Sequence, residues 1–207
     1  KNPIWKKSEL GLPIPESKHA VSVALPEWND VIAYEEKNPE CINSLKSIYP
    51  RFGINPLLKK LSDNLLKQTN LRKHNAWPYS NRNLVLKAKI YCDKFTDHSN
   101  SFIKEYQSLF FLITTGDANN YAKIFWQHTG LGASSREAAI SLKLESRAEN
   151  DLAKDSERII IKRISKYVQS NSELIHITSS GMSALYSALE IIYKIFPKKP
   201  TLQIGFP

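Results

Sequence analysis

The sequence predicts an α/β protein, and three observations support this fold class. A short apolar run, Leu174 to Ile177, precedes a Ser-Gly turn and then apolar residues at helical spacing as far as Pro197. A second run typical of a strand covers Thr201 to Phe206. Amphipathic helical patterns dominate the middle of the chain. We therefore expect an extended arm, a mixed and mostly helical middle region, and the start of a mainly parallel sheet with helices on both faces.

The N-terminal residues 1–25 contain Pro3, Pro13 and Pro15 and show little periodicity, which predicts an extended arm that lies on another part of the protein. A helix is expected to start near Trp28, with Pro26 close to its first position. Residues 48–56 then form a loop rich in Pro, Tyr, Arg and Asn. Such a loop is either merely exposed or carries function.

Residues at helical spacing predict the helices that follow, and one apolar run predicts a buried strand. The expected helices contain Leu57, Leu61 and Leu65; Leu84, Ala88, Tyr91 and Phe95; Asp117 to Gln127, ended by the turn at Gly130; the capping box Ser134 to Glu137 with Ala139 and Leu142; and Ile160, Ile164, Tyr167 and Val168. The expected strand is Leu109 to Ile113.

The composition is that of a globular protein with a solvated, basic surface. The chain has 207 residues, 42% of them hydrophobic and 24% charged, with a net charge of +9. This positive charge is compatible with nucleic acid, anionic lipid or a phosphate-bearing ligand as a partner. Acidic residues are mixed with the basic ones along the chain, which favours a solvated surface over a binding stripe. Cys41 and Cys92 have neither metal-ligand nor disulfide-scaffold spacing, which predicts reduced thiols. No apolar run is long enough to span a membrane, and no secretory signal opens the chain.

The ends of the chain favour a fragment. It starts at Lys1 without methionine and stops at Pro207, next to a predicted strand. A parallel sheet begun at Leu174 would need further strands, so apolar area would be left open. The alternative is a complete chain that closes its sheet with Leu109 to Ile113 and Val21 to Leu25.

The chemistry-bearing feature is the turn before the last helix. A hydroxyl residue at the helix N-cap and a glycine beside it leave backbone N–H groups free at the positive end of the helix dipole. This arrangement holds an anion, typically a phosphate, although ordinary capping gives the same local pattern. The five histidines are isolated and do not favour a metal site. Ser179, Ser180 and Ser183 have no neighbouring base, and no lysine has a context that indicates a Schiff base.

Several stretches in this order resemble one family. Residues 19–36 resemble the start of fungal cystathionine gamma-synthases, and Tyr-Pro-Arg-Phe at 49–52 with Asn-Pro at 55–56 is similar to a pattern of the wider group of cystathionine-metabolising enzymes that use pyridoxal 5'-phosphate (PLP). Ser-Gly-Met-Ser-Ala at 180–184 resembles that group's phosphate-binding turn, with serine in place of one alanine. Residues 125–130 and 134–137 resemble an insertion of the fungal branch.

The resemblance implies a cofactor site. Ser180, Gly181 and Met182 would form the phosphate turn, with the amides of Gly181 and Met182 holding the phosphate of PLP. Tyr49 and Arg51 would reach the cofactor of a neighbouring subunit, since a guanidinium binds phosphate through two parallel bonds. The family's Schiff-base lysine lies well downstream of this turn, so no catalytic residue is expected here, and the chain alone should be inactive.

The implied protein is a PLP-dependent cystathionine gamma-synthase of fungal type, which joins an O-acylhomoserine to cysteine in methionine and cysteine metabolism. Its fold would be the large three-layer αβα domain of fold-type I transferases, beginning at residues 171–207, after an arm and loop at 1–56 and an inserted region at 57–170. The resemblance also implies amino-acid substrates, a homodimer or homotetramer with shared sites, no membrane, and a cytoplasmic or also nuclear location. Alternatives are a related lyase, a homocysteine-forming sulfhydrylase, or, from another class, a non-catalytic module that binds nucleic acid.

Overall fold

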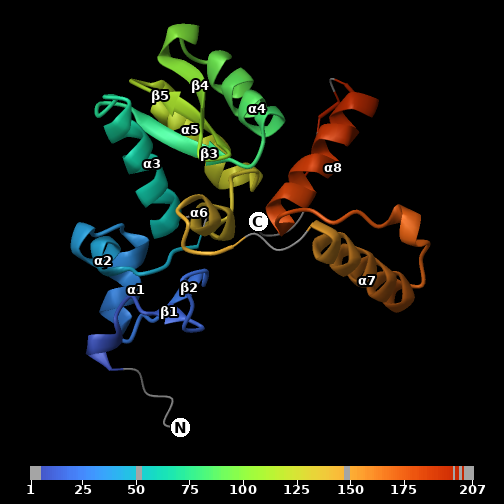
Figure 1. Cartoon of the computed structure of the whole chain (residues 1–207), viewed down its shortest axis with the longest axis horizontal. Helices are drawn as coiled ribbons and strands as arrows, with labels where there is room; N and C mark the ends of the chain where they lie inside the picture. Colours follow the sequence, from blue (N-terminus) through green and yellow to red (C-terminus); the bar gives the residue numbers. More distant parts are fainter. Residues whose placement is uncertain (1–5, 50–52, 147–149, 198, 201, 203–207) are drawn as a thin grey trace. The chain divides into compact units, whose positions relative to one another are not determined.

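The protein has a mixed α/β structure, seen in a computed structural model that describes residues 6–49, 53–146, 150–197, 199, 200 and 202 (Figure 1). The chain divides into two compact units. The first comprises Lys1–His128 and Gly132–Arg147, and the second comprises Thr129–Leu131 and Ala148–Pro207. The division predicted at residues 56 and 170 concerns domains of the family and stays a prediction.

The helices and strands alternate irregularly along the chain. The helices are α1 (Trp28–Glu35), α2 (Pro39–Ser44), α3 (Pro56–Gln68), α4 (Arg82–Asp93), α5 (Ala118–Thr129), α6 (Ser135–Ser141), α7 (Asn150–Val168) and α8 (Gly181–Ile195). The strands are β1 (Pro13–Ile14), β2 (Ser22–Val23), β3 (Asn75–Tyr79), β4 (Ser101–Tyr106) and β5 (Leu109–Thr114). Short 3-10 turns are η1 (Lys7–Glu9), η2 (His98–Asn100) and η3 (Ser172–Leu174).

The helices predicted from periodicity are confirmed, except that Phe95 lies beyond the end of α4 at Asp93, and their starts follow the capping signals. Asn55 caps α3 by accepting the amide of Leu57 at 2.9 Å, and Pro56 takes the first helical position. Ser134 and Glu137 form the predicted capping box of α6. The helix expected near Trp28 also forms, but Glu27 is its N-cap, so Pro26 lies before the helix.

The first unit is organised around a three-stranded antiparallel sheet in the order β3-β5-β4. Leu109 to Ile113 forms the predicted buried strand, and it is the central one. The two residues that join β4 to β5, Gln107 and Ser108, both have positive φ, 50° and 65°. Such turns suit the twist of a hairpin, but they normally use Asn or Gly, so this sequence gave no turn signal. Pro78 lies in β3, which pairs with β5 alone among the named strands and can therefore accept a proline.

The core of this unit lies on both faces of the sheet. Successive residues of a strand point to opposite faces, and Phe111, Leu112 and Ile113 are all fully buried. Helix α3 contacts β3, and α4 contacts β4 and β5. On β3, the indole of Trp77 donates to Thr114 Oγ1 at 2.9 Å, which satisfies its N–H inside the core. The ring of Tyr79 packs edge-on against Trp126 of α5, with 5.6 Å between the ring centroids.

The predicted N-terminal arm folds back on itself. Strands β1 and β2 form a two-stranded hairpin, preceded by η1. The hairpin is fastened by His19, whose Nδ1 lies 3.0 Å from Ser135 Oγ of α6 and whose Nε2 lies 2.9 Å from Glu145 Oε1. Hydrogen bonds from Lys18 and then from His19 lower the pKa of Glu145 to about 2. The arm thus packs against the rest of the first unit, as predicted for a segment that makes few contacts within itself.

Two sequence predictions about strands are wrong. Leu174 to Ile177 forms no strand: Leu174 ends η3, and the extended backbone of Ile175, with φ −105° and ψ 118°, has no partner strand among the described residues. The alternative sheet of Leu109 to Ile113 with Val21 to Leu25 is also wrong, because β5 pairs with β3 and β4 while β2 pairs with β1. A strand forms only when another strand pairs with it, and a local sequence pattern does not identify that partner. The run Thr201 to Phe206 lies outside the described residues apart from Leu202, which is exposed.

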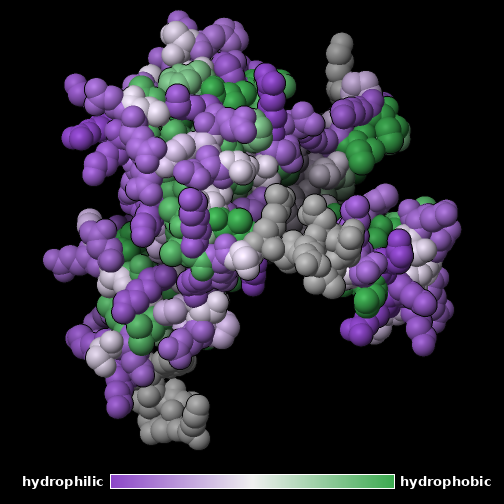
Figure 2. Space-filling model, viewed as in Figure 1, coloured by the Kyte–Doolittle hydropathy of each residue, from purple (hydrophilic) through white to green (hydrophobic). Residues whose placement is uncertain are grey.

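The second unit buries few of its apolar side chains. Figure 2 shows hydrophobic residues at the surface of α7 and of α8. They include Ile159 and Ile164 of α7 and Leu185, Ile191 and Ile195 of α8. These helices therefore gain little of their stability from a core within the described part of this unit. None of the helices in the described ranges is both long and apolar enough to cross a membrane.

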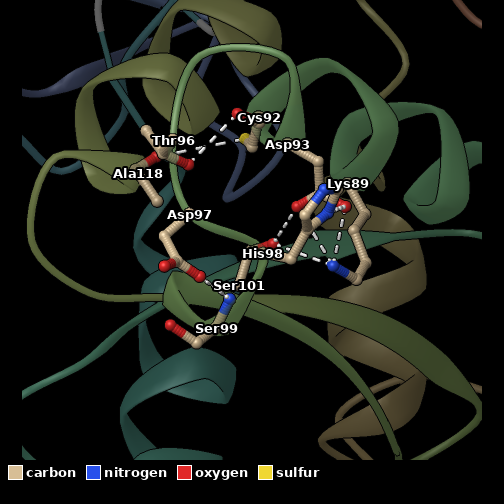
Figure 3. A network of polar contacts seen from close by, with 9 residues as sticks. All are labelled: Lys89, Cys92, Asp93, Thr96, Asp97, His98, Ser99, Ser101 and Ala118. Atoms are coloured by element: carbon tan, nitrogen blue, oxygen red, sulfur yellow. Dashed lines mark hydrogen bonds and ion pairs between the residues drawn. The ribbon is translucent and has the colours of Figure 1, made fainter.

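A partly buried ion network joins the end of α4 to the start of β4 (Figure 3). Lys89 Nζ lies 2.8 Å from Asp93 Oδ2, and the same carboxylate accepts from Ser101 Oγ at 2.8 Å and lies 2.9 Å from His98 Nδ1. Burial opposes ionisation of Asp93, but the bonds from Lys89, His98 and Ser101 outweigh it and hold the pKa of the carboxyl group below its usual value.

We expect Asp93→Asn to destabilise the first unit by about 1 to 3 kcal/mol at neutral pH, because Lys89 is left without its anion. The pKa of Asp93 is lower when folded than when unfolded, so its stabilisation is present above the unfolded pKa of about 4 and is lost as the pH falls further. Urea unfolding between pH 7 and pH 3 should show the difference from the wild type shrinking with acid.

Asp97→Asn is the matched control, since Asp97 is exposed and only caps Ser99, a role that asparagine also fills. Equal losses of stability in the two variants would contradict the assigned role of Asp93.

Candidate phosphate-binding turn

The turn before α8 is built by reciprocal bonds between two serines. Ser180 is the N-cap, and its Oγ accepts the amide of Ser183 at 3.1 Å. In return, Ser183 Oγ accepts the amide of Ser180 at 2.9 Å. This is a capping box in which serine takes the place of the usual Glu or Gln. The first turn of the helix is therefore held in one conformation by its own side chains.

The hydroxyl groups of the turn are occupied internally. Ser183 is 2% exposed, and its Oγ also donates to the Ser180 carbonyl at 2.8 Å and lies 3.2 Å from Ser179 Oγ. Thr178 Oγ1 donates to the same carbonyl at 2.8 Å. These serines contact no base in this turn, so the geometry gives no activated nucleophile. Their role is to shape the backbone.

Two backbone amides are left to face outward. Gly181 and Met182 occupy the first two helical positions, and the first amide with an intrahelical acceptor is that of Ala184, which donates to the Ser180 carbonyl at 3.1 Å. Neither amide donates to any residue in the described part of the chain. A side-chain atom built on Gly181 would meet nothing within 4 Å, so the space beside it is open. The first turn of α8 carries no acidic residue. A positive helix end with free donors is the arrangement that can hold an anion, so this turn is a candidate anion site.

Gly130 closes the inner side of the turn, and sequence reasoning assigned it only to ending a helix. It has φ +64°, which fits that prediction, and its carbonyl lies 3.3 Å from Ser180 Oγ and 3.4 Å from Ser179 Oγ. A Cβ atom on Gly130 would come within 2.4 Å of Ser180 Oγ and 2.9 Å of the Ser183 nitrogen. Only glycine fits here. The contact joins residues about fifty positions apart, so the local pattern gave no signal for it.

The structure brings together some of the predicted site residues. Ser180, Gly181 and Met182 form one turn, as their adjacency requires. Tyr49 belongs to the first unit and is 45% exposed, and its carbonyl accepts the amide of Gly53 at 3.2 Å. Arg51 lies outside the described residues. A group of His, Cys, Asp or Glu side chains able to hold a metal ion is absent from the part of the chain that the structure describes.

The fold and the turn define a mixed α/β protein with a candidate anion site at a helix N-terminus, and its sequence relatives are fungal proteins. Over 148 residues, 62% of this chain, it is 31% identical to a Saccharomyces cerevisiae protein whose name assigns it provisionally to the cystathionine gamma-synthases. The cystathionine gamma-synthase of Neurospora crassa is 28% identical over 159 residues, 63% of this chain. That of Saccharomyces cerevisiae is 51% identical over 49 residues, 24% of this chain and 8% of the relative.

These matches confirm the resemblance: the chain is related to fungal cystathionine gamma-synthases over about 60% of its length. The aligned part covers 23% of the first of these relatives and 25% of the Neurospora crassa enzyme, so the chain corresponds to about a quarter of their length. No family model matches the chain. No solved structure matches it either.

The Gly130 contact leads to a prediction about the turn. Gly130→Ala should lower the free energy of unfolding by more than the roughly 1 to 2 kcal/mol that a left-handed alanine costs, because its methyl group also displaces Ser180. It should also speed hydrogen exchange of the Ser183 amide, which loses a well-placed acceptor. Urea unfolding and exchange followed by NMR measure the two effects.

Gly116→Ala provides the control. Gly116 has φ +53°, but a Cβ atom there would meet nothing within 4 Å, so it carries the backbone strain without the contact. Unchanged Ser183 exchange in Gly130→Ala would show that Gly130 does not support the turn.

Proposed function

We propose that this chain supplies the phosphate-binding turn of a PLP-dependent cystathionine gamma-synthase, which joins an O-acylhomoserine and cysteine to give cystathionine. The observation that carries the proposal is the pair of free amides of Gly181 and Met182 beside open space at the N-terminus of α8. The relatedness to fungal cystathionine gamma-synthases supports the choice of reaction.

The residues present fit the phosphate of the cofactor. A phosphate needs several donors that converge on its oxygens, and each charge-assisted bond contributes about 1.5 to 3 kcal/mol. Gly181 and Met182 supply two such donors, and the dipole of α8, which runs over 15 residues, adds a favourable potential. Ser180 and Ser183 hold the turn in place without ligand. The site therefore costs little reorganisation when an anion binds.

When bound, PLP supplies the electron sink for the reaction at the substrate's amino acid carbons. The part of this chain is to hold and orient the cofactor through its phosphate. We assign Tyr49 and Arg51 to the phosphate of a neighbouring subunit's cofactor, because the resemblance places them there and both side chains donate to phosphate oxygens. This role requires a homodimer or homotetramer. The relatives are about four times as long as the aligned stretch, which leaves room for a Schiff-base lysine and for a complete fold-type I domain.

A lyase or a sulfhydrylase of the same group would hold PLP through the same turn, so the turn does not distinguish the reactions. The cytoplasm is the compartment that two reduced, buried cysteines favour. Nucleic-acid binding has less support, because the basic residues of α7 are accompanied by acidic ones. Arg158, for example, lies 4.0 Å from Asp155.

The phosphate assignment can be tested with Gly181→Pro. Proline is accepted at the first position of a helix, and the extended backbone of Ser180, with φ −160° and ψ 163°, suits the residue before a proline. The open space beside Gly181 leaves room for the ring. The variant removes one phosphate donor and keeps the helix. We expect it to weaken binding of inorganic phosphate and of PLP about tenfold or more, measured by NMR titration of the Met182 amide.

Gly181→Ala is the matched control, since it keeps the amide and adds a methyl group in the same open space. Its phosphate affinity should stay within about twofold of the wild type. The proposal fails if phosphate does not shift the Met182 amide in the wild type, or if the proline and alanine variants bind equally well. Circular dichroism should show the same helix content in all three proteins.

A further inference from the structure

The first unit contains a large cavity that the proposed phosphate turn does not use. Its volume is about 1020 Å³, and it lies among α2 and the segment after it, α3, and the start of β3. A cavity of this size accommodates a small organic molecule. All of its lining residues belong to the first unit, whereas the turn before α8 belongs to the second. The cavity is therefore a separate candidate site.

The deeper lining is largely apolar. It includes the side chains of Ile42, Leu45, Ile54, Leu66 and Trp77. Trp77 is 8% exposed, and its bond to Thr114 fixes the position of the indole ring. Leu66 is also buried. An occupant of this part of the cavity needs an apolar body, and a flat ring can pack against the indole.

Lysines give the cavity a positive charge. Lys37, Lys59, Lys60 and Lys123 line it, and Asp63 is the acidic residue of the lining. Asp63 is engaged by Lys59, with 2.8 Å between Nζ and Oδ2. The other three lysines form no ion pair with any residue in the described ranges. All of these lysines are exposed, so the positive charge lies toward solvent while the apolar lining lies deeper.

We propose that this cavity binds a small organic anion that combines an apolar, ring-sized body with a carboxylate. The body packs against Trp77 and the aliphatic side chains, and the carboxylate pairs with Lys60 and Lys123. The inference does not depend on the phosphate turn, because the two sites share no residue.

Phenylacetate is a suitable probe, titrated into the full 207-residue chain and followed by calorimetry and by the NMR signals of the Trp77 indole N–H and the Leu66 amide, both from residues that line the cavity. We expect both signals to shift together. Phenethylamine has the same ring with a cation, and inorganic phosphate is an anion without a ring, so each should bind at least about tenfold more weakly. Binding of phenethylamine as tight as that of phenylacetate would overturn the proposal.

Two sets of variants locate the charge. Replacing Lys60 and Lys123 together by Gln should weaken phenylacetate binding about tenfold or more. The matched control replaces Lys73 and Lys94, which are exposed and do not line the cavity, and should leave the affinity unchanged. Equal effects of the two pairs would show that only net charge matters, which contradicts a built site.

Gly181→Pro separates this inference from the proposed function. The variant should lose phosphate binding at the Met182 amide and keep phenylacetate binding at Trp77. Absence of any phenylacetate shift at Trp77 in the wild type would overturn the cavity site alone. Loss of phenylacetate binding in Gly181→Pro would place the probe at the turn and also overturn it.

Discussion

The bond from the Ser183 amide to Ser180 Oγ is the interaction on which the candidate site depends. It satisfies the third amide of α8 at 3.1 Å and leaves the first two, those of Gly181 and Met182, pointing outward. If a longer acceptor such as Glu stood at position 183, its negative charge would lie in the first turn and oppose an anion. Serine closes the capping box without charge. The same choice of residue thus stabilises the helix start and keeps it able to receive a phosphate.

In the first unit, the packing of the helices depends on the central strand β5. Its residues are buried on both faces, so helices must cover both sides of a sheet of only three strands. The covering elements are then tied at their ends by polar contacts, by Asp93 between α4 and β4 and by His19 between the hairpin and α6. Hydrophobic burial determines which helices pack on the sheet. The few charged groups fix the positions of the segments that connect these layers. The N-terminal arm is held by both kinds of contact, since Ala20 and Ala24 are buried and His19 bonds to Ser135.

The sequence predicted the helices well because their information is local. Apolar residues at helical spacing placed α3, and the same spacing with Ser134 and a serine before Gly181 as caps placed α6 and α8. Strands β3 and β4 were missed, since Pro78 interrupts one and the Gln107-Ser108 turn lacks the usual residues. Leu174 to Ile177 has the composition of a strand but no partner. For the site, Gly181 and Met182 were identified by motif, whereas Gly130 was not, because its contact with Ser180 depends on tertiary structure.

The two anion sites that we propose differ in physical origin. At α8 the positive potential comes from backbone amides and the helix dipole, which do not titrate, and the donors are fixed before the ligand arrives. In the cavity it comes from flexible, exposed lysines around a mouth, where salt screens the attraction strongly, so affinity must come largely from burial of an apolar body against Trp77. A bare phosphate fits the first arrangement and gains little from the second. The two proposed sites would therefore select their ligands by how much apolar surface accompanies the charge.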